Sequence, residues 1–142
     1  MHIHQISVFL ENRIGQLAEI THLLADAGVD IRALSIAETS DYGLARMIVN
    51  DSYKASSILL QHGDILSMTP VWAVEVPDRP GGLSEVLSDL AEAHVDVEYM
   101  YSLFTHREGH AYMVMRVSDD PRFLSTHRVR SEERRVGKEC RS

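Results

Sequence analysis

The chain has 142 residues, 44% of them hydrophobic and 25% charged, which are ordinary proportions for a soluble globular protein. Its net charge is −7. Residues 127–142 hold six basic and three acidic residues, so residues 1–126 carry a net charge of −10. A charge of this sign repels the phosphate backbone of nucleic acids. No apolar run reaches the roughly 18 residues of a membrane span, and the start lacks the order of a signal peptide. The single cysteine, Cys140, excludes an internal disulfide. We therefore expect a cytoplasmic protein with neither nucleic acid nor membrane as its partner.

The chain begins with a pattern that is typical of a strand followed by a helix. Residues 6–10 are rich in β-branched and aromatic side chains, which favours a strand. Gly28 stands where a left-handed residue would end the helix, because glycine adopts a positive φ without steric cost. The apolar residues that recur at helical spacing before it are Leu17, Ile20, Leu24 and Ala27.

A hairpin, a second helix and a strand follow. The predicted hairpin joins residues 29–39 to residues 44–51 through a turn in which Gly43 suits a positive φ. Residues 52–63 then read as a helix, and residues 65–68 as a short strand ahead of Pro70. The order is β-α-β-β-α-β, which predicts an α+β unit with an antiparallel sheet and helices on one face.

The second half of the chain repeats the first. Asp78 lies 66 positions after Asn12, and this offset holds without a gap for about 40 residues. It predicts a second strand over residues 71–76, a second helix from Leu83 to Ala93 and a second hairpin. In and around the hairpin turn, the offset matches Thr39, Gly43, Ala45 and Met47 with Thr105, Gly109, Ala111 and Met113.

The second unit is predicted to be incomplete. At the same offset residues 58–66 face residues 124–132, where the apolar residues of a closing helix and strand are absent after Leu124. The polar, basic segment that follows resembles no other part of the chain, and we exclude it from functional reasoning as a disordered or non-native tail. We therefore expect one unit over residues 1–69, a truncated unit over residues 70–124 and a tail over residues 125–142.

Each unit carries a similar loop before its first helix. One interpretation is a helix cap, because Asn12 and Asp78 are residue types that accept hydrogen bonds from a helix start, and Pro80 suits the first turn. A cap, however, requires no glycine near an arginine. It also requires no acidic residue 18 positions later, where Asp30 and Asp96 stand in the two units.

The other interpretation is a site for a free amino acid. The N–H groups of a helix start attract a carboxylate, and glycine lets a ligand approach the backbone closely. Asn12 or Asp78, together with Asp30 or Asp96, can accept hydrogen bonds from an ammonium group. Because 18 residues correspond to roughly one helix, each aspartate need not lie near the loop of its own unit, and it can meet the loop of a neighbouring unit or subunit.

At these residues the chain resembles the ACT domain family of amino-acid-binding regulatory modules. The resemblance rests on residues 11–17 with 28–31 and on residues 77–83 with 94–97, and it covers residues 6–69 fully and 71–120 in part. It implies two ferredoxin-like βαββαβ units that pair through sheets or helices, with a ligand at the interface between units.

The resemblance also implies which residues contact the ligand. Ile14 replaces a proline that Pro80 retains, and aspartate stands where members that contact the amine often have asparagine. The implied ligand-binding residues are Asn12, Arg13, Ile14, Gly15, Gln16, Leu17 and Asp30 in the first unit, and Asp78, Arg79, Pro80, Gly81, Gly82, Leu83 and Asp96 in the second.

Other chemistry finds little support in the sequence. The eight histidines are not joined by a cysteine or carboxylate set at zinc-like spacing. The serines belong to no Ser–His–acid arrangement that the sequence allows us to assign, and residues 79–86 are too short for a phosphate loop. We therefore expect no metal, no cofactor and no catalytic residue.

The leading hypothesis is a non-enzymatic regulatory protein, a stand-alone ACT repeat that forms a homodimer, binds a free amino acid between ACT units and acts on a regulated enzyme. A second hypothesis is an interaction module that binds no ligand and partners an amino-acid biosynthetic enzyme or regulator. A third is a small enzyme on the same fold, which would need a convergent set of titrating side chains.

Overall fold

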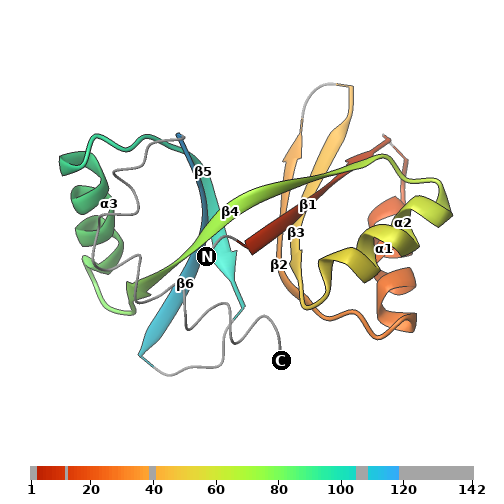
Figure 1. Cartoon of the computed structure of the whole chain (residues 1–142), viewed down its shortest axis with the longest axis horizontal. Coiled ribbons are helices and arrows are strands. Elements are labelled where there is room, and N and C mark those ends of the chain that lie inside the picture. Colours follow the sequence, from red (N-terminus) through yellow and green to blue (C-terminus); the bar gives the residue numbers. More distant parts are fainter. Residues whose placement is uncertain (1–2, 12, 39–40, 105–108, 119–142) are drawn as a thin grey trace. The chain divides into compact units, whose positions relative to one another are not determined.

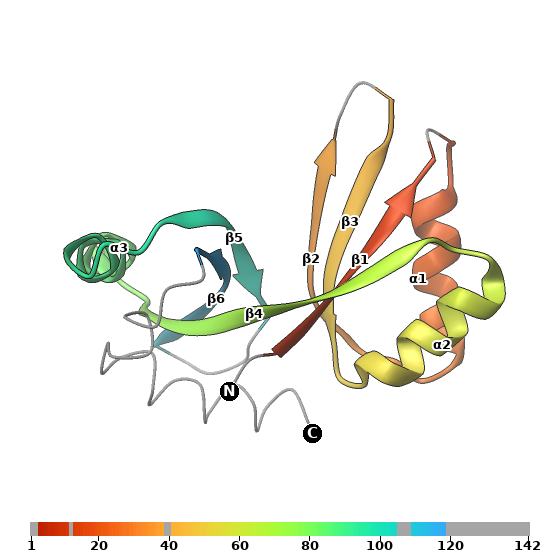
Figure 2. The same cartoon turned by 45° about the horizontal axis from the view of Figure 1, so that its top comes forward.

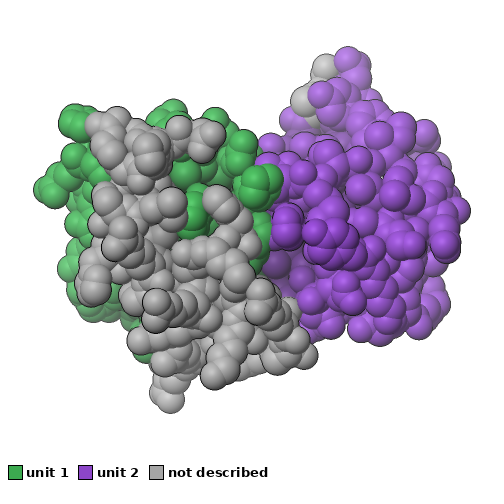
Figure 3. Space-filling view, in the orientation of Figure 1, with its two compact units in different colours: residues 1–3, 70–140, 142 green, residues 4–69, 141 purple. Residues whose placement is uncertain are grey.

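The computed structural model describes residues 3–11, 13–38, 41–104 and 109–118. They form two compact units, which Figure 3 distinguishes by colour. Residues 4–69 make the N-terminal unit, and Ile3 together with the described residues from Pro70 to Ser118 makes the C-terminal unit. Among the described residues, no helix combines the length and the apolar composition that crossing a membrane requires.

The N-terminal unit has the predicted β-α-β-β-α-β order. Its strands lie in the order β2-β3-β1-β4, and β3 pairs antiparallel with β1 and with β2. Both helices lie on one face of this sheet (Figures 1 and 2). The elements are β1 (Ile3–Leu10), α1 (Gln16–Asp26), β2 (Ile31–Glu38), β3 (Gly43–Val49), α2 (Ser52–His62) and the beginning of β4 (Leu66–Pro77).

A continuous apolar core lies between the helices and the sheet of this unit. Alternate residues of β1 and β3 face it because successive side chains of a strand point to opposite faces. The helices contribute residues at helical spacing, as the sequence predicts. The buried members are Ile6, Val8, Leu10, Ile20, Leu24, Val29, Ala45, Met47, Val49, Ala55 and Leu59.

The C-terminal unit repeats the first part of this pattern. After β4 it contains α3 (Gly82–Glu92), β5 (Val97–Leu103) and β6 (His110–Val117). Its strands lie in the order β4-β6-β5 with antiparallel pairing, which confirms the α+β fold class. The predicted loss of the closing helix and strand falls beyond residue 118, outside the described residues. The buried core consists of Trp72, Val74, Val76, Val86, Leu90, Val95, Met115 and Val117.

Strand β4 differs from the expectation of two separate strands at Pro70. It runs unbroken from Leu66 to Pro77 and therefore belongs to both units. Proline lacks an N–H group and is tolerated in a strand where no ladder donor is needed. Pro70 is exposed, and its carbonyl accepts a hydrogen bond of 2.9 Å from the guanidinium of Arg116.

The two hairpins are not equal in length. The prediction that equivalent residues of the two units are always 66 positions apart is therefore wrong beyond the hairpin turn. Met47 pairs with Ile6 and Leu34, and the residue in the equivalent place is Met115, which pairs with Trp72 and Met100. Trp72 lies 66 positions after Ile6, whereas Met115 lies 68 after Met47. The second hairpin therefore holds two more residues, and the matches beyond its turn, Met47 with Met113 among them, are wrong by two positions.

The turn glycine of the first hairpin also behaves differently from the prediction. Gly109 has the expected positive φ of 76°, but Gly43 is not among the glycines with a positive φ. Gly43 instead begins β3 and pairs with Leu10, whose side chain would lie 3.5 Å from an added Cβ. It is therefore a strand residue that approaches Leu10 closely.

Both repeat helices end in a left-handed residue, as the sequence predicts for Gly28. Gly28 has a φ of 76°, and His94, at the matching position, is forced to a φ of 57°. In each unit the next residue donates its N–H to the helix, Val29 to Leu24 and Val95 to Leu90, both at 2.9 Å. A residue with a Cβ is strained in this conformation.

We expect His94→Gly to raise the free energy of unfolding by about 0.5–1 kcal/mol, because glycine removes this strain. The matched reverse change, Gly28→Ala, should lower it by about 1 kcal/mol, since an added Cβ at Gly28 meets no atom within 4 Å and only φ opposes it. Urea denaturation of the two variants measures both values. Equal stabilities for both variants and the parent would contradict this account.

Candidate functional site

The two repeat helices begin in nearly the same backbone conformation. Gly15 precedes α1 with φ 85° and ψ −3°, and Gly81 precedes α3 with φ 84° and ψ −6°. An added Cβ would meet no atom within 4 Å at either glycine, so the positive φ, and not packing, requires glycine there. The space beside each glycine is open, and both residues are exposed.

Neither helix start carries a side-chain cap. Helix α2 of the same chain shows the usual arrangement, in which the Asp51 side chain accepts a 3.1 Å hydrogen bond from the Lys54 N–H. Asp78 makes no such bond to α3, so the cap interpretation is wrong for this residue. Asn12 lies outside the described residues.

Free N–H groups therefore point out of both helix starts. The first helical bonds are donated by Glu19 to Gly15 and by Glu85 to Gly81, both at 3.0 Å. The N–H groups of residues 17–18 and 83–84 precede these bonds and find no partner among the described residues. Unpaired N–H groups with the helix dipole behind them form a socket for an anion.

The second position of the loop differs between the units. The Gly82 N–H already donates to the Arg79 carbonyl at 3.0 Å, and an added Cβ would collide with the Pro77 carbonyl. Packing on Pro77 therefore explains the second glycine of this loop. The matching Gln16 is buried, and its amide oxygen has no partner in the described structure.

Both loop arginines fold back onto their own helix. Arg13 lies 3.2 Å from Glu19, and Arg79 contacts both carboxylate oxygens of Glu85 at 2.8 and 2.7 Å. All four side chains are about half exposed. The family resemblance implies that these arginines contact the ligand, and it does not predict the pairs, although an arginine followed six positions later by a glutamate occurs in both repeats.

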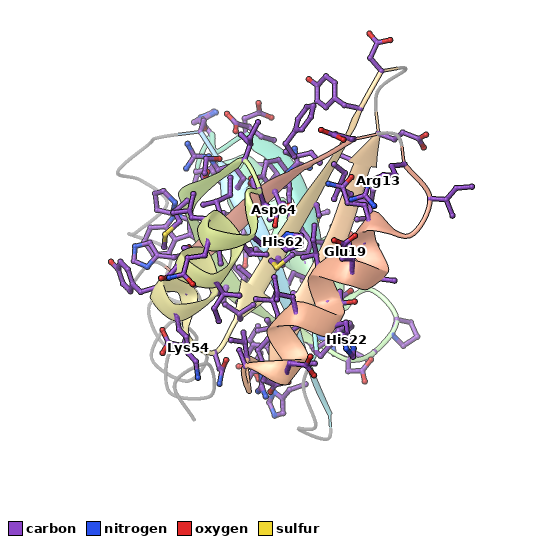
Figure 4. The ribbon with its side chains drawn as sticks, turned by 90° about the vertical axis from the view of Figure 1, so that its right-hand side faces the viewer. Arg13, Glu19, His22, Lys54, His62 and Asp64 are labelled. Atoms are coloured by element: carbon purple, nitrogen blue, oxygen red, sulfur yellow. The ribbon has the colours of Figure 1, made fainter. Side chains whose placement is uncertain are left out.

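The pair in the N-terminal unit extends into a larger network (Figure 4). The second Glu19 oxygen lies 3.0 Å from His62 Nε2, and His62 Nδ1 lies 2.8 Å from Asp64. The bond to Arg13, followed by the bond to His62, lowers the pKa of Glu19. The bond to Asp64 is the main cause that raises the pKa of His62. His62 and Asp64 were not singled out in the sequence, because helix α2 must fold onto α1 before they meet Glu19.

The two predicted amine-contacting aspartates differ in their partners. Asp30 donates its N–H to the Asn50 side chain at 2.9 Å, and Asp96 donates to Ser118 at 3.3 Å, so both backbones are fixed alike. The Asp30 carboxylate is paired with Arg32 at 3.2 Å. Among the described residues the Asp96 carboxylate has no partner, because Glu98 occupies the position of Arg32.

The structure does not bring loop and aspartate of one unit together. In each unit the loop lies at the start of a helix, α1 or α3, and the aspartate follows the end of that helix. Each helix has 11 residues and spans about 16 Å. The loop residues Arg13 to Leu17 and Asp78 to Leu83, by contrast, cluster at their helix starts. Ile14 is fully exposed at the loop tip, and Leu83 is 40% exposed.

Other kinds of site are not built by the described residues. Within residues 3–11, 13–38, 41–104 and 109–118, no three histidine, cysteine or carboxylate side chains are placed to hold a metal ion. His110 pairs with the buried Glu75 on neighbouring strands. His22 pairs with Asp26 one turn further along α1, at 3.3 Å.

Comparison with known proteins places this geometry in a family. Residues 1–126 match the family described as the ACT domain pair. A curated relative, the acetolactate synthase small subunit of Aquifex aeolicus, is 28% identical over 107 residues, which are 71% of this chain and 56% of the relative. The chain thus spans about half the length of that relative.

Solved structures agree with this assignment. The crystal structure of protein BT0572 from Bacteroides thetaiotaomicron is 36% identical with a TM-score of 0.78, over 98% of this chain and 88% of that one. The ligand-free regulatory subunit of aspartate kinase from Thermus thermophilus shares the fold at 14% identity, with a TM-score of 0.64 over 96% of this chain and 91% of that one.

We expect Arg13→Gln to raise the pKa of Glu19 toward the ordinary glutamate value, because Arg13 is the main cause that lowers it. A carboxyl-carbon NMR titration measures the change. Arg32→Gln is the matched control, since it removes an ion pair at the other end of α1 and should leave the Glu19 titration in place. A Glu19 pKa that is the same in Arg13→Gln and the parent would refute the ion pair.

Proposed function

The chain belongs to the ACT domain pair family, and we propose that it is a non-enzymatic regulatory protein that binds a free amino acid between ACT units. The observation that carries this proposal is the repeated helix start at Gly15 and Gly81, where glycine replaces a side-chain cap and N–H groups stay unpaired. A carboxylate satisfies these groups, and the open space beside each glycine admits it.

The ammonium group of the ligand requires a second element. Asp30 and Asp96 lie about one helix length, roughly 16 Å, from the loop of their own unit, which exceeds the size of an α-amino acid head group. We therefore propose that a loop of one ACT unit and an aspartate of another ACT unit bind one ligand together. The proposal includes a homodimer, which supplies additional pairings of loop and aspartate.

The expected affinity suits a sensor. Two charge-assisted hydrogen bonds contribute about 1.5–3 kcal/mol each, and modest burial of the ligand side chain brings the dissociation constant to about micromolar to millimolar. Occupancy in this range follows the concentration of a metabolite. Ligand binding can then shift an equilibrium between two arrangements of the protein, provided that it favours one of them.

A regulated enzyme is the proposed partner. The curated relative is by name the small subunit of acetolactate synthase, which favours a role beside another subunit of an enzyme. The proposal keeps the cytoplasmic location that the sequence predicts. The charged groups of the network are paired with one another, and we propose that they serve binding and not catalysis.

One observation favours a second candidate, an interaction module that binds no ligand. Arg13 and Arg79 are both closed onto glutamates of their own helices, so the protein's own carboxylates already occupy two cations that an amino acid would use. Under this alternative the exposed loop, with Ile14 at its tip, contacts a partner protein.

Calorimetric titration with each of the twenty amino acids separates the two candidates. We expect at least one to bind the parent at micromolar to millimolar concentration. Gly15→Ala combined with Gly81→Ala should weaken binding by about tenfold or more, because the strained loops no longer present their N–H groups.

Gly63→Ala is the matched control for backbone strain. Gly63 has a φ of 96° and the same open surroundings, but it ends α2 and lies outside both loops. Because Gly63 stands between His62 and Asp64 of the network, the affinity of Gly63→Ala should change by much less than the about tenfold loss expected of the loop variant. Absence of binding by the parent, with co-purification of another protein, supports the interaction module and overturns amino-acid sensing.

We further expect the two aspartates to contribute unequally. Asp96→Asn should weaken binding more than Asp30→Asn, by a factor of about three or more, because Arg32 already neutralises Asp30 whereas Asp96 has no partner in the described structure. Calorimetry on both variants with the amino acid that the screen identifies measures the ratio. A larger effect of Asp30→Asn would show that the free carboxylate is not the ammonium contact.

A further inference from the structure

His62 faces two carboxylates, one with each ring nitrogen. Its Nε2 lies 3.0 Å from Glu19 and its Nδ1 lies 2.8 Å from Asp64. An ionised carboxylate only accepts hydrogen bonds, and a neutral imidazole has a single N–H group. Both contacts are hydrogen bonds at the same time only when both ring nitrogens are protonated. The geometry is therefore that of a charged histidine.

Loss of one proton must break one of the two contacts. The side chain of Asp64 is only 7% exposed, and its backbone is fixed by a 3.0 Å hydrogen bond from its N–H to the Leu59 carbonyl. The side chain of Glu19 is 46% exposed. A buried carboxylate loses more than an exposed one when its donor leaves. Neutral His62 therefore keeps Asp64 and releases Glu19.

Glu19 is also the partner of the loop arginine. One of its oxygens faces His62 and the other faces Arg13, with a single contact of 3.2 Å. In the other unit Arg79 contacts both oxygens of Glu85 at 2.8 and 2.7 Å. The arginine pair is thus looser where a histidine shares the carboxylate. Arg13 and His62 compete for the charge of Glu19.

We propose that proton uptake by His62 loosens Arg13 from Glu19 and thereby strengthens the binding of an amino-acid carboxylate at the loop before α1. The inference rests on the proposed function and adds a pH control to it. When the ligand draws Arg13 away, Glu19 retains a positive partner only if His62 is charged. By linkage, binding then raises the pKa of His62, and the complex takes up protons.

Among the described residues, the charged groups that face His62 all come from the N-terminal unit. The charged side chains that face His62 are Glu19 from α1 and Asp64 from the turn before β4, and Arg13 stands behind Glu19 (Figure 4). His22 lies further along α1 and Lys54 at the opposite end of α2, as Figure 4 shows. Asp64 raises the pKa of His62 above the ordinary histidine value of 6.5, so the switch operates near and above that pH.

Affinity measured against pH tests the inference, with the twenty amino acids as probes, each supplied alone at up to millimolar concentration. In the parent we expect affinity to fall by about two- to fivefold as the pH rises through the pKa of His62, the effect of one exposed ion pair. Calorimetry in buffers of different ionisation enthalpy should show proton uptake on binding. His62→Gln should remove both effects.

Two further variants sharpen the test. Glu19→Gln frees Arg13 permanently, so the affinity of this variant for the amino acid at high pH should match that of the parent at low pH. The pKa of His62 in the ligand-free variant should fall, because the Glu19 carboxylate is lost. His22→Gln is the matched control, because it removes another histidine–carboxylate pair of α1 and should keep the pH dependence.

The outcomes distinguish the two proposals. Absence of binding at every pH overturns the proposed function together with this inference. Binding with the same affinity at pH 6 and pH 9, or a Glu19→Gln variant that binds no tighter than the parent at high pH, overturns the inference alone. An NMR titration in which His62 keeps its pKa in Glu19→Gln would also overturn it.

Discussion

The positive φ of Gly15 and Gly81 is the constraint on which the rest of the site depends. A helix start usually hides its first N–H groups behind a capping side chain, as Asp51 does for α2. A left-handed glycine stands at the cap position of α1 and of α3, and it brings no capping side chain with it. The N–H groups of α1 and α3 therefore remain exposed, at a cost that water or a ligand must offset. These N–H groups are the physical basis of the proposed anion socket.

The same scaffold carries different electrostatics in its two copies. The backbones at the helix starts differ by a few degrees only, and the strand starts are fixed alike by Asn50 and Ser118. The side chains around them have diverged, since Arg32 neutralises Asp30 whereas Glu98 leaves Asp96 unpaired among the described residues. Under the proposed function, backbone geometry sets where a ligand is held, and the side chains set how strongly each copy holds it.

The sequence predicts most of the fold, because apolar periodicity and glycine placement are local. The helices, the cores and the left-handed end at Gly28 follow from such patterns. Features that depend on pairing do not. The two extra residues of the second hairpin change no local pattern. A proline such as Pro70 interrupts a strand only at a position where the sheet requires an N–H donor, and the sequence does not show whether it does. The Glu19–His62 contact joins residues 43 positions apart, so no spacing rule reveals it.

The loop arginines change how the site must be understood. A pocket whose cations were free would bind any anion, including phosphate and chloride, and a sensor of that kind would be saturated by common ions. Here Glu19 and Glu85 hold the two arginines, and exposed ion pairs are weak enough for a well-placed ligand to replace them. A ligand that offers only a negative charge gains little by the exchange. Under the proposed function, a ligand that also places an ammonium group on an aspartate gains a second contact, and we propose that this second contact favours a free amino acid over a simple anion.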